Sequence, residues 1–228
     1  MIRRWVRMEQ VAKKVLEEKY LAVLKEAKEY EQRVKNGKRW EGNTVLIVLD
    51  SALDSIGLNY FKIVAPRVRK FYRLYVKTGE IDSIEKFSKL SLEDPRLLKL
   101  MHNERVWNVA IETCKLLKKI RKKNGFATDF EALKHWAEKA DYENWQKDPM
   151  GKIYGIGLCT FQYLRLQAGV DTTMPDKIIK RVMEQDFGIK AEDDIQFIKE
   201  MEKISKETGY SQIFLCWAIW LKYSDLES

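Results

Sequence analysis

Cysteine, histidine, glycine and proline are all scarce in this chain of 228 residues, and the scarcity of metal-binding side chains excludes a class of site. Cys114, Cys159 and Cys216 lie far apart and form no CxxC pair, and the two histidines are His102 and His135. A zinc site or an iron–sulfur cluster needs several such ligands at short spacing, so we expect neither. Each cysteine lies in an apolar helical pattern, which predicts buried free thiols.

Long hydrophobic runs are also missing. The sequence contains no stretch of about 18 apolar residues, the length that a membrane helix requires. The first ten residues, MIRRWVRMEQ, are basic and lead into a charged helical pattern, whereas a signal peptide has an apolar centre. We therefore expect a cytoplasmic or nucleoid protein with no membrane partner.

What the chain has in excess is positive charge. Lysine and arginine number 42 against 34 acidic residues, a net charge of +8. Such an excess favours a polyanionic partner, because neutralised phosphates release counterions and add affinity that does not depend on sequence. A thermophile-type surface rich in lysine and glutamate would give the same composition, so charge alone leaves both interpretations open.

The few glycines and prolines separate segments in which apolar residues recur every 3.6 positions, which predicts an all-α fold of about ten helices. Residues 45–49, VLIVL, would suit a strand, but no partner strand is evident, so we predict a buried helix there. The predicted helical segments are residues 6–35, 44–54, 59–77, 84–90, 95–101, 106–122, 129–140, 142–146, 150–154, 158–168, 175–186, 192–208 and 211–224.

The domain organisation follows from the longest of these segments. We predict that residues 1–40 form a long N-terminal helix packed on the core, and that it either covers the core as an extra layer or meets a partner. Residues 41–228 form the core, with a hairpin at 150–168. The core is one compact unit or two interlocked helical subdomains, and we expect a monomer.

The most informative stretch is residues 152–182, KIYGIGLCTFQYLRLQAGVDTTMPDKIIKRV. Gly155 and Gly157 permit a tight turn and a close approach of the backbone to a ligand. Ile156 can then turn inward while the unpaired N–H groups at the start of the next helix face an anion such as a phosphate. The alternative is an ordinary turn that uses glycine for steric reasons.

An aspartate follows the hairpin at the start of a further helix. Pro175 and Asp176 open that helix, so the Asp176 carboxylate is a candidate N-cap whose charge the helix dipole favours. A fixed carboxylate at this place suits cleavage of a glycosidic bond, whose transition state resembles an oxocarbenium ion. A capping aspartate with no catalytic role is the alternative.

Together these features resemble the signature of the helix-hairpin-helix DNA glycosylase superfamily, the fold of endonuclease III and of adenine and 8-oxoguanine glycosylases. Residues 45–64 and 105–117 are similar to further helices of that family, so the resemblance covers roughly residues 44–188. The residues that carry it are the hairpin Gly155, Ile156 and Gly157, the aspartate Asp176, and Ile178, Ile179, Arg181 and Val182 in the following helix.

The resemblance implies a function. It implies a DNA base-excision glycosylase that grips double-stranded DNA through the hairpin, extrudes a damaged or mispaired base and hydrolyses the N-glycosidic bond with Asp176. It implies no cofactor beyond a monovalent cation at the hairpin. The basic side chains expected to contact DNA are Lys152, Lys177, Lys180 and Arg181.

The chain also departs from the family pattern. Cys159 stands where bifunctional members carry the lysine that forms a Schiff base, and a thiol cannot form that imine, so the resemblance implies excision without strand cleavage. Lys152 lies on the other side of the turn and is a poor substitute. Where many members place a glutamine to fill the space of an extruded base, Leu53 is a candidate wedge or a core residue. The four-cysteine cluster of the family is absent as well.

Base extrusion also requires a pocket with aromatic faces. The sequence offers candidates by type only, and most aromatic residues at helical spacing belong to the core: Trp40, Trp107, Trp136, Trp145, Trp217 and Trp220. Because the lysine and the glutamine are missing, a DNA-binding protein on the same fold without excision activity remains the second hypothesis.

Overall fold

The regular structure in the described part of the protein is entirely helical. The computed structural model describes residues 14–223, in which the helices are joined by turns and no strand is present, and this confirms the predicted all-α class. None of the helices in this part of the chain is both long enough and apolar enough to cross a bilayer.

The α-helices are α2 (Leu21–Lys35), α3 (Thr44–Asp54), α4 (Ala65–Phe71), α5 (Ile84–Phe87), α6 (Pro95–Leu98), α7 (Glu104–Asn124), α8 (Asp129–Lys139), α9 (Leu158–Gln167), α10 (Lys177–Phe187), α11 (Asp194–Thr208) and α12 (Gln212–Tyr223). Shorter helical elements are η1 (Arg39–Gly42), η2 (Tyr60–Val64), η3 (Tyr72–Val76) and η4 (Trp145–Lys147).

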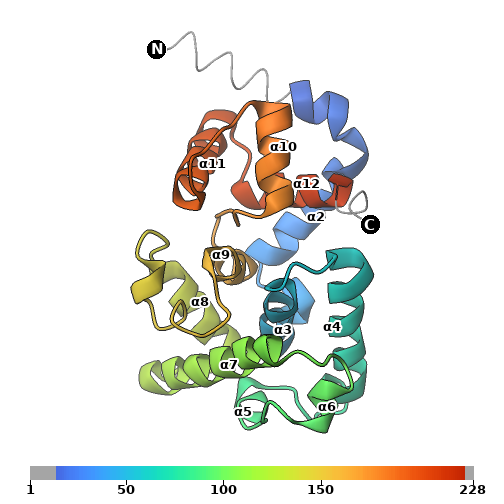
Figure 1. Ribbon diagram of the computed structural model, residues 1–228, viewed down its shortest axis with the longest axis vertical. Coiled ribbons are helices and arrows are strands. Elements are labelled where there is room, and N and C mark those ends of the chain that lie inside the picture. The colour runs from blue at the N-terminus through green and yellow to red at the C-terminus, as the bar shows by residue number, and fades with distance from the viewer. Residues whose placement is uncertain (1–13, 224–228) are drawn as a thin grey trace.

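The helices form two lobes with separate hydrophobic cores (Figure 1). Helices α3 to α8 make the lower lobe, and α2, α10, α11 and α12 make the upper lobe. Helix α9 lies between them: Phe161 and Leu164 belong to the lower core, while Tyr163 and Leu166 belong to the upper core. Because every residue of α9 except Cys159 is buried, the helix has no exposed polar face and its sequence shows little amphipathic pattern.

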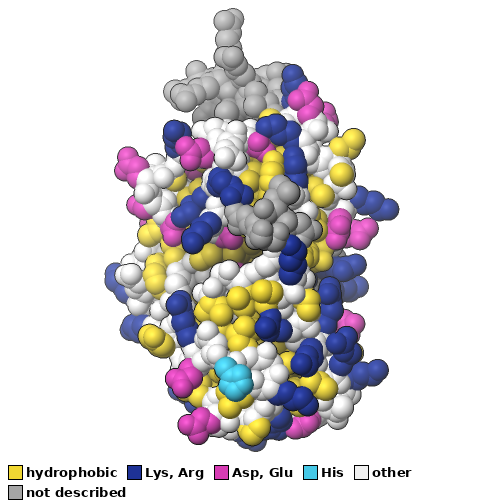
Figure 2. Space-filling model, turned by 45° about the vertical axis from the view of Figure 1, so that its right-hand side comes forward, with side chains coloured by type: hydrophobic (Ala, Val, Ile, Leu, Met, Phe, Trp, Pro, Cys, Tyr) yellow, Lys and Arg dark blue, Asp and Glu magenta, His cyan; other side chains and the backbone are white. Residues whose placement is uncertain are grey.

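Positive charge gathers on one side of the lower lobe. Figure 2 brings the side of α4 forward and shows more Lys and Arg than Asp and Glu side chains along it. We call the exposed basic residues of α4 and its two flanking elements the α4 stripe. Its members are Lys62, Arg69, Lys70, Arg73 and Lys77.

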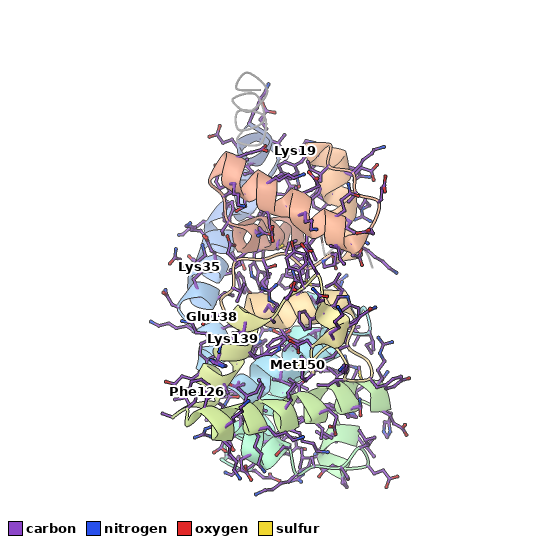
Figure 3. All side chains as sticks on the ribbon, turned by 90° about the vertical axis from the view of Figure 1, so that its left-hand side faces the viewer. Lys19, Lys35, Phe126, Glu138, Lys139 and Met150 are labelled. Carbon is purple, nitrogen blue, oxygen red and sulfur yellow. The ribbon has the colours of Figure 1, made fainter. Side chains whose placement is uncertain are left out.

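The upper lobe is built from both ends of the described chain. Helix α2 packs along α12, so it covers the core rather than projecting from it. The predicted helix of residues 6–35 is broken at Tyr20, between a helical segment at residues 14–19 and α2; residues 6–13 lie outside the described part. Tyr20 is fully buried, and its hydroxyl and the Nζ of Lys19 (labelled in Figure 3) donate to the Asp186 carboxylate of α10 at 2.7 and 2.6 Å.

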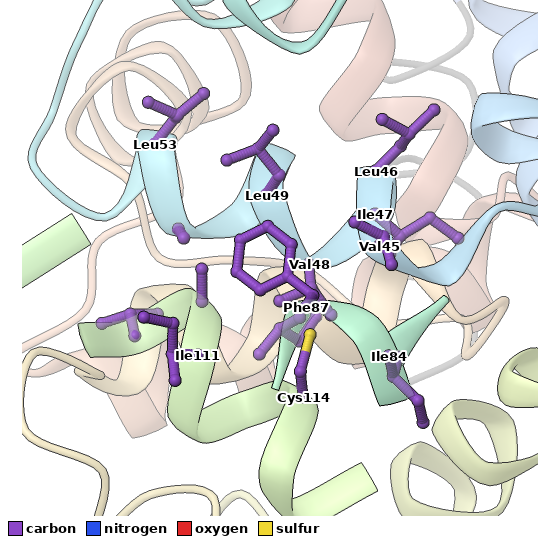
Figure 4. Packing of buried hydrophobic residues seen from close by; sticks show 14 of the residues in the cluster. Val45, Leu46, Ile47, Val48, Leu49, Leu53, Ile84, Phe87, Ile111 and Cys114 are labelled. Carbon is purple, nitrogen blue, oxygen red and sulfur yellow. The ribbon is translucent and has the colours of Figure 1, made fainter. Parts of the chain in front are cut away.

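The centre of the lower lobe is helix α3. Every residue from Thr44 to Leu53 is buried, which explains why its apolar run resembles a strand and yet forms a helix: the helix is enclosed on all sides. Figure 4 shows Val48 of α3 close to Phe87 of α5 and Cys114 of α7.

Residues 59–77 form three elements, whereas the sequence predicted one helix. Wide π-helical turns η2 and η3 flank α4. Pro66 in the first turn of α4 has no N–H to donate and its ring crowds the preceding turn, so a widened turn before it accommodates the proline. The predicted segments 142–146 and 150–154 are also not α-helices; they contain only η4 and turns around Pro149 and Gly151.

Candidate active site between the two lobes

The glycine hairpin is held by the first turns of helix α7. Asn108 Nδ2 donates to the carbonyl oxygen of Tyr154 at 2.7 Å, and Arg105 Nη2 donates to that of Gly155 at 3.2 Å. Gly155 has a φ of +102°, and a Cβ there would lie 2.7 Å from Cγ2 of Val109, so only glycine fits. Ile156 is buried in the lower core, as the Gly-apolar-Gly pattern predicted.

The hairpin leads directly into the start of helix α9. Gly157 is the N-cap residue, and no side chain caps the helix. The first-turn N–H groups are therefore not occupied by a capping oxygen, which is the property that an anion site at a helix start requires. Next to them, Tyr154 exposes 78% of its surface at the tip of the hairpin. Sequence reasoning missed this tyrosine, although an aromatic residue directly before a Gly-apolar-Gly turn is a visible signal.

Asp176 occupies the N-cap position of α10, as predicted. Its Oδ1 accepts a hydrogen bond from the backbone N–H of Ile179 at 2.8 Å. The loop that leads to it is fixed from α9: the fully buried Gln162 donates to the Thr172 hydroxyl at 2.7 Å and to the Thr173 carbonyl oxygen at 3.1 Å. The helix that starts at the hairpin therefore also positions the loop before the aspartate.

The starts of α9 and α10 open onto one cavity of about 390 Å³ between the lobes. This volume lies within the range of about 300–1,000 Å³ that is typical of small-molecule sites. Its walls come from the loop after α3, from α9, from α10 and from α12. The lining residues are Asp54, Ser55, Gly57, Leu58, Asn59, Tyr60, Cys159, Thr160, Met174, Pro175, Asp176, Lys177, Ile178 and Trp220.

Two titratable groups in this cavity, Asp54 and Cys159, have strongly raised pKa values. Withdrawal from water, together with the negative charges of Asp50 and Asp176, raises the pKa of the Asp54 carboxyl well above its usual range. Burial and the charges of Asp54, Asp176 and Asp194 likewise raise the pKa of the Cys159 thiol well above its usual range. Both shifts favour the protonated forms of these two groups, which line the cavity together with Asp176.

The predicted DNA contacts differ in their surroundings. Lys152 and Arg181 are exposed, and Lys177 is exposed at the rim of the cavity. Lys180 is half-buried, and its Nζ pairs with Asp194 at 2.6 Å. Leu53 is 1% exposed in the lower core, so of its two interpretations the structure favours the core residue, and it is not placed to act as a wedge.

The candidate tryptophans and the cysteines fall into two groups, those that line a cavity and those that pack in or against a core. Among the six candidate tryptophans, Trp220 lines the Asp176 cavity and Trp40 lines a second cavity. The others, Trp107, Trp136, Trp145 and Trp217, pack in or against the cores. Cys114 and Cys216 are buried free thiols as predicted, whereas Cys159 is only half-buried because it faces the cavity.

Sequence reasoning missed Asp54 and Tyr60 as cavity residues. Their signal was weak, because nothing local marks a residue at the end of a buried helix as part of a site formed by distant segments.

In residues 14–223, no group of three or more His, Cys, Asp and Glu side chains is arranged to hold a metal ion. Comparison with protein-family models, with curated proteins and with solved structures finds no match.

Proposed function

We propose that this protein is a DNA N-glycosylase without lyase activity, which extrudes a damaged or mispaired base from double-stranded DNA and hydrolyses its N-glycosidic bond. One observation carries the proposal: Asp176, Asp54 and the first turn of the helix that follows the glycine hairpin line the same cavity. The resemblance of residues 152–182 to the helix-hairpin-helix glycosylases adds to it, because that family also combines a hairpin with an aspartate.

The two carboxyl groups of the cavity suit the two charges that develop in this reaction. As the bond breaks, positive charge grows on the sugar and negative charge on the departing base. Asp176 lies at the positive end of α10, which favours its charged form, and the carboxylate stabilises the sugar cation and orients the attacking water. The raised pKa of Asp54 favours its protonated form, and we assign it the role of proton donor to the departing base.

The proposed chemistry is hydrolysis alone. Cleavage of the DNA strand through an imine needs an amine at the sugar, and the α9 position at which the resembled family carries its lysine holds the thiol of Cys159. Lys177, the lysine among the lining residues, is exposed at the rim, and we assign it to a DNA phosphate. Because its pKa is raised, this thiol is also a poor nucleophile at neutral pH. Water therefore takes the place of an enzyme nucleophile.

The proposed DNA grip combines the hairpin with nearby exposed cations. The N–H groups at the start of α9 and the side chains of Lys152, Lys177 and Arg181 supply contacts to phosphates. Lys180 contributes when DNA phosphates compete with Asp194 for its ammonium group.

A panel of duplexes tests the proposal. Each duplex carries one uracil, mismatched, alkylated or oxidised base, and mild alkali after incubation reveals abasic sites. We expect at least one lesion to be excised, with strand cleavage only after alkali. Asp176→Asn keeps a side chain that can cap α10 and should lower excision by about 10²- to 10⁴-fold with little change in duplex binding. Asp193→Asn is a matched control, since Asp193 caps α11 in the same way outside the cavity.

Two outcomes contradict the proposal. Excision that survives Asp176→Asn unchanged removes the role assigned to this carboxylate. Salt-dependent duplex binding with no excision of any lesion in the panel favours instead a DNA-binding protein that lacks base-excision activity.

A further inference from the structure

A second and larger cavity lies outside the Asp176 site. It has a volume of about 670 Å³ and is formed by the end of α2, by η1, by η2 and by α4. Tyr60 lines both cavities, so the two are neighbours. Half-buried aromatic side chains and exposed cations make up most of the wall: Tyr30, Trp40, Tyr60, Phe61, Arg33, Lys38 and Arg69, together with Glu41, Ala65 and the buried Arg39.

Within residues 14–223, the exposed cations of this cavity have no carboxylate partners. Arg33, Lys38 and Arg69 form no ion pair with any side chain in the described part of the protein, and Glu41 is the one acidic residue of the wall. Three unneutralised cations around a concave surface attract an anion, and guanidinium groups match the oxygens of a phosphate.

The backbone beside the cavity adopts a conformation that is rare for residues with side chains. Trp40 has a φ of +48° and Glu41 a φ of +58°, both in the left-handed region. Strain of this kind persists where surrounding contacts enforce it, and it concentrates at ligand sites. Here the Nε1 of Trp40 donates to Oδ2 of Asp50 at 2.5 Å, and the Arg39 guanidinium lies 4.7 Å from the indole ring.

The same buried cluster makes the position of Trp40 rigid. Arg39 is 6% exposed and donates to Asp50 at 2.9 Å and to Gln167 of α9 at 3.0 Å. Gln167 itself donates to Asp50 at 2.8 Å. A fixed aromatic side chain at the wall of a cationic cavity suits a nucleotide. Any planar base can stack on the aromatic ring, while the cations hold the phosphate.

We propose that this second cavity binds a nucleotide, with its phosphate at Arg33, Lys38 and Arg69 and its base against the aromatic wall. The nucleotide has two sources, a free mononucleotide or one unit of a bound DNA strand. The α4 stripe favours the strand, since it continues from Arg69 through Lys70 and Arg73, and the sequence between Asp54 and Glu80 has no acidic residue (Figure 2). This site does not depend on the proposed glycosylase activity.

Calorimetric titration of the full chain tests the proposal with three probes: deoxyguanosine monophosphate, deoxyguanosine and inorganic phosphate. We expect the mononucleotide to bind most tightly. The double variant Arg33→Ala/Lys38→Ala should weaken its binding by about tenfold, since two charge-assisted contacts are lost. The control is Lys122→Ala/Lys123→Ala, which removes the same charge from exposed residues at the far end of α7 (Figure 1).

A second arm identifies the source of the nucleotide. A single strand that carries 5-iododeoxyuridine is irradiated with the protein, and the cross-linked peptide is identified by mass spectrometry. A cross-link to Trp40, Tyr30 or Phe61 supports a strand nucleotide, even when the mononucleotide alone does not bind.

The proposal is overturned when neither the mononucleotide nor the strand engages these residues. Where the mononucleotide does bind, the proposal also fails when both double variants weaken that binding equally, or when deoxyguanosine or phosphate binds as tightly as the mononucleotide. Asp176→Asn should leave all of these measurements unchanged, so the result is independent of the excision assay.

Discussion

The side-chain amide of Asn108 donates a hydrogen bond of 2.7 Å to the backbone carbonyl oxygen of Tyr154, across 46 positions of the sequence. This contact ties the glycine hairpin to α7, the longest α-helix of the lower lobe. The hairpin therefore has a rigid support although no regular helix precedes it, and the exposed ring of Tyr154 is carried on a backbone that cannot easily shift.

The two hairpin glycines should respond differently to alanine. At Gly155 the positive φ and the contact with Val109 leave no room for a Cβ, so Gly155→Ala should destabilise the protein by about 1–3 kcal/mol. At Gly157 the φ is −104° and no atom lies within 4 Å of an added Cβ, so Gly157→Ala should leave the melting temperature unchanged. If this surface approaches DNA phosphates, the added methyl group should nevertheless weaken duplex binding.

Thermal melting and fluorescence anisotropy on the same duplex separate these effects. Equal melting temperatures for the two variants contradict the geometry of the hairpin. Unchanged duplex binding by Gly157→Ala contradicts its role as a DNA grip.

Asp54 should impose a pH dependence on stability. Its pKa is raised in the folded protein, so the unfolded chain releases this proton at lower pH and folding becomes less favourable as the pH rises. Asp54→Asn should therefore match the wild type in stability near the ordinary aspartate pKa of about 4. At higher pH the free energy of unfolding of Asp54→Asn should exceed that of the wild type. This difference should grow until the pH passes the raised pKa of Asp54. Urea unfolding at several pH values measures this, and a difference that stays constant with pH refutes it.

The same carboxyl should shape the activity. When Asp54 acts as the proton donor, excision falls as the pH rises above its raised pKa. Asp54→Asn should be slow at every pH and should lack this alkaline decline, which a series of single-turnover rates will show.

Cys159 should be convertible into a lyase residue. A lysine at this position would place an amine in the cavity next to Asp176, where it can form an imine with the aldehyde of an abasic sugar. Borohydride reduction of that imine should leave a covalent complex of Cys159→Lys with a duplex that contains an abasic site. This assay needs no knowledge of the lesion.

Cys159→Ser is the control for the trapping experiment and should excise bases at the wild-type rate. A folded Cys159→Lys protein that traps no more DNA than the serine variant would show that this wall of the cavity does not face the sugar.

Asp186 should stabilise the upper lobe at neutral pH and lose this effect in acid. Burial alone would raise the pKa of this carboxyl, but hydrogen bonds from Lys19, Tyr20 and Tyr223 outweigh it and lower the pKa. Asp186→Asn should cost about 1–3 kcal/mol at pH 7. The cost should shrink as the pH falls through the lowered pKa, because the wild-type carboxylate is then protonated as well.

Guanidinium unfolding at pH 7 and near pH 3 tests this contribution. Glu184→Gln is the control on the same helix, since Glu184 pairs with Lys190 in an exposed contact worth about 0–1 kcal/mol. Equal losses for the two variants at pH 7 would contradict the assignment.

Local pattern was enough to predict much of this structure. The inward turn of Ile156, the capping position of Asp176 and the buried helix α3 all follow from glycine, proline and apolar spacing within a few residues. The break at Tyr20 does not, and the buried side chain at this break donates its hydrogen bond to Asp186, which is 166 residues away. The left-handed turn at Trp40 and the raised pKa of Asp54 likewise depend on charges and contacts that only the assembled lobes supply.

The order of the helices along the chain has a consequence for synthesis on the ribosome. Helices α3 to α8 follow one another, so the lower lobe can fold while the chain is still emerging. Helix α2 emerges earlier than the lower lobe, yet its packing partner α12 is made after the whole of that lobe, and until then the apolar face of α2 lacks this partner. The cavity with Asp176 and Trp220 is therefore completed only after α12 has been synthesised, so a nascent chain that stops before α12 lacks one wall of the proposed excision site.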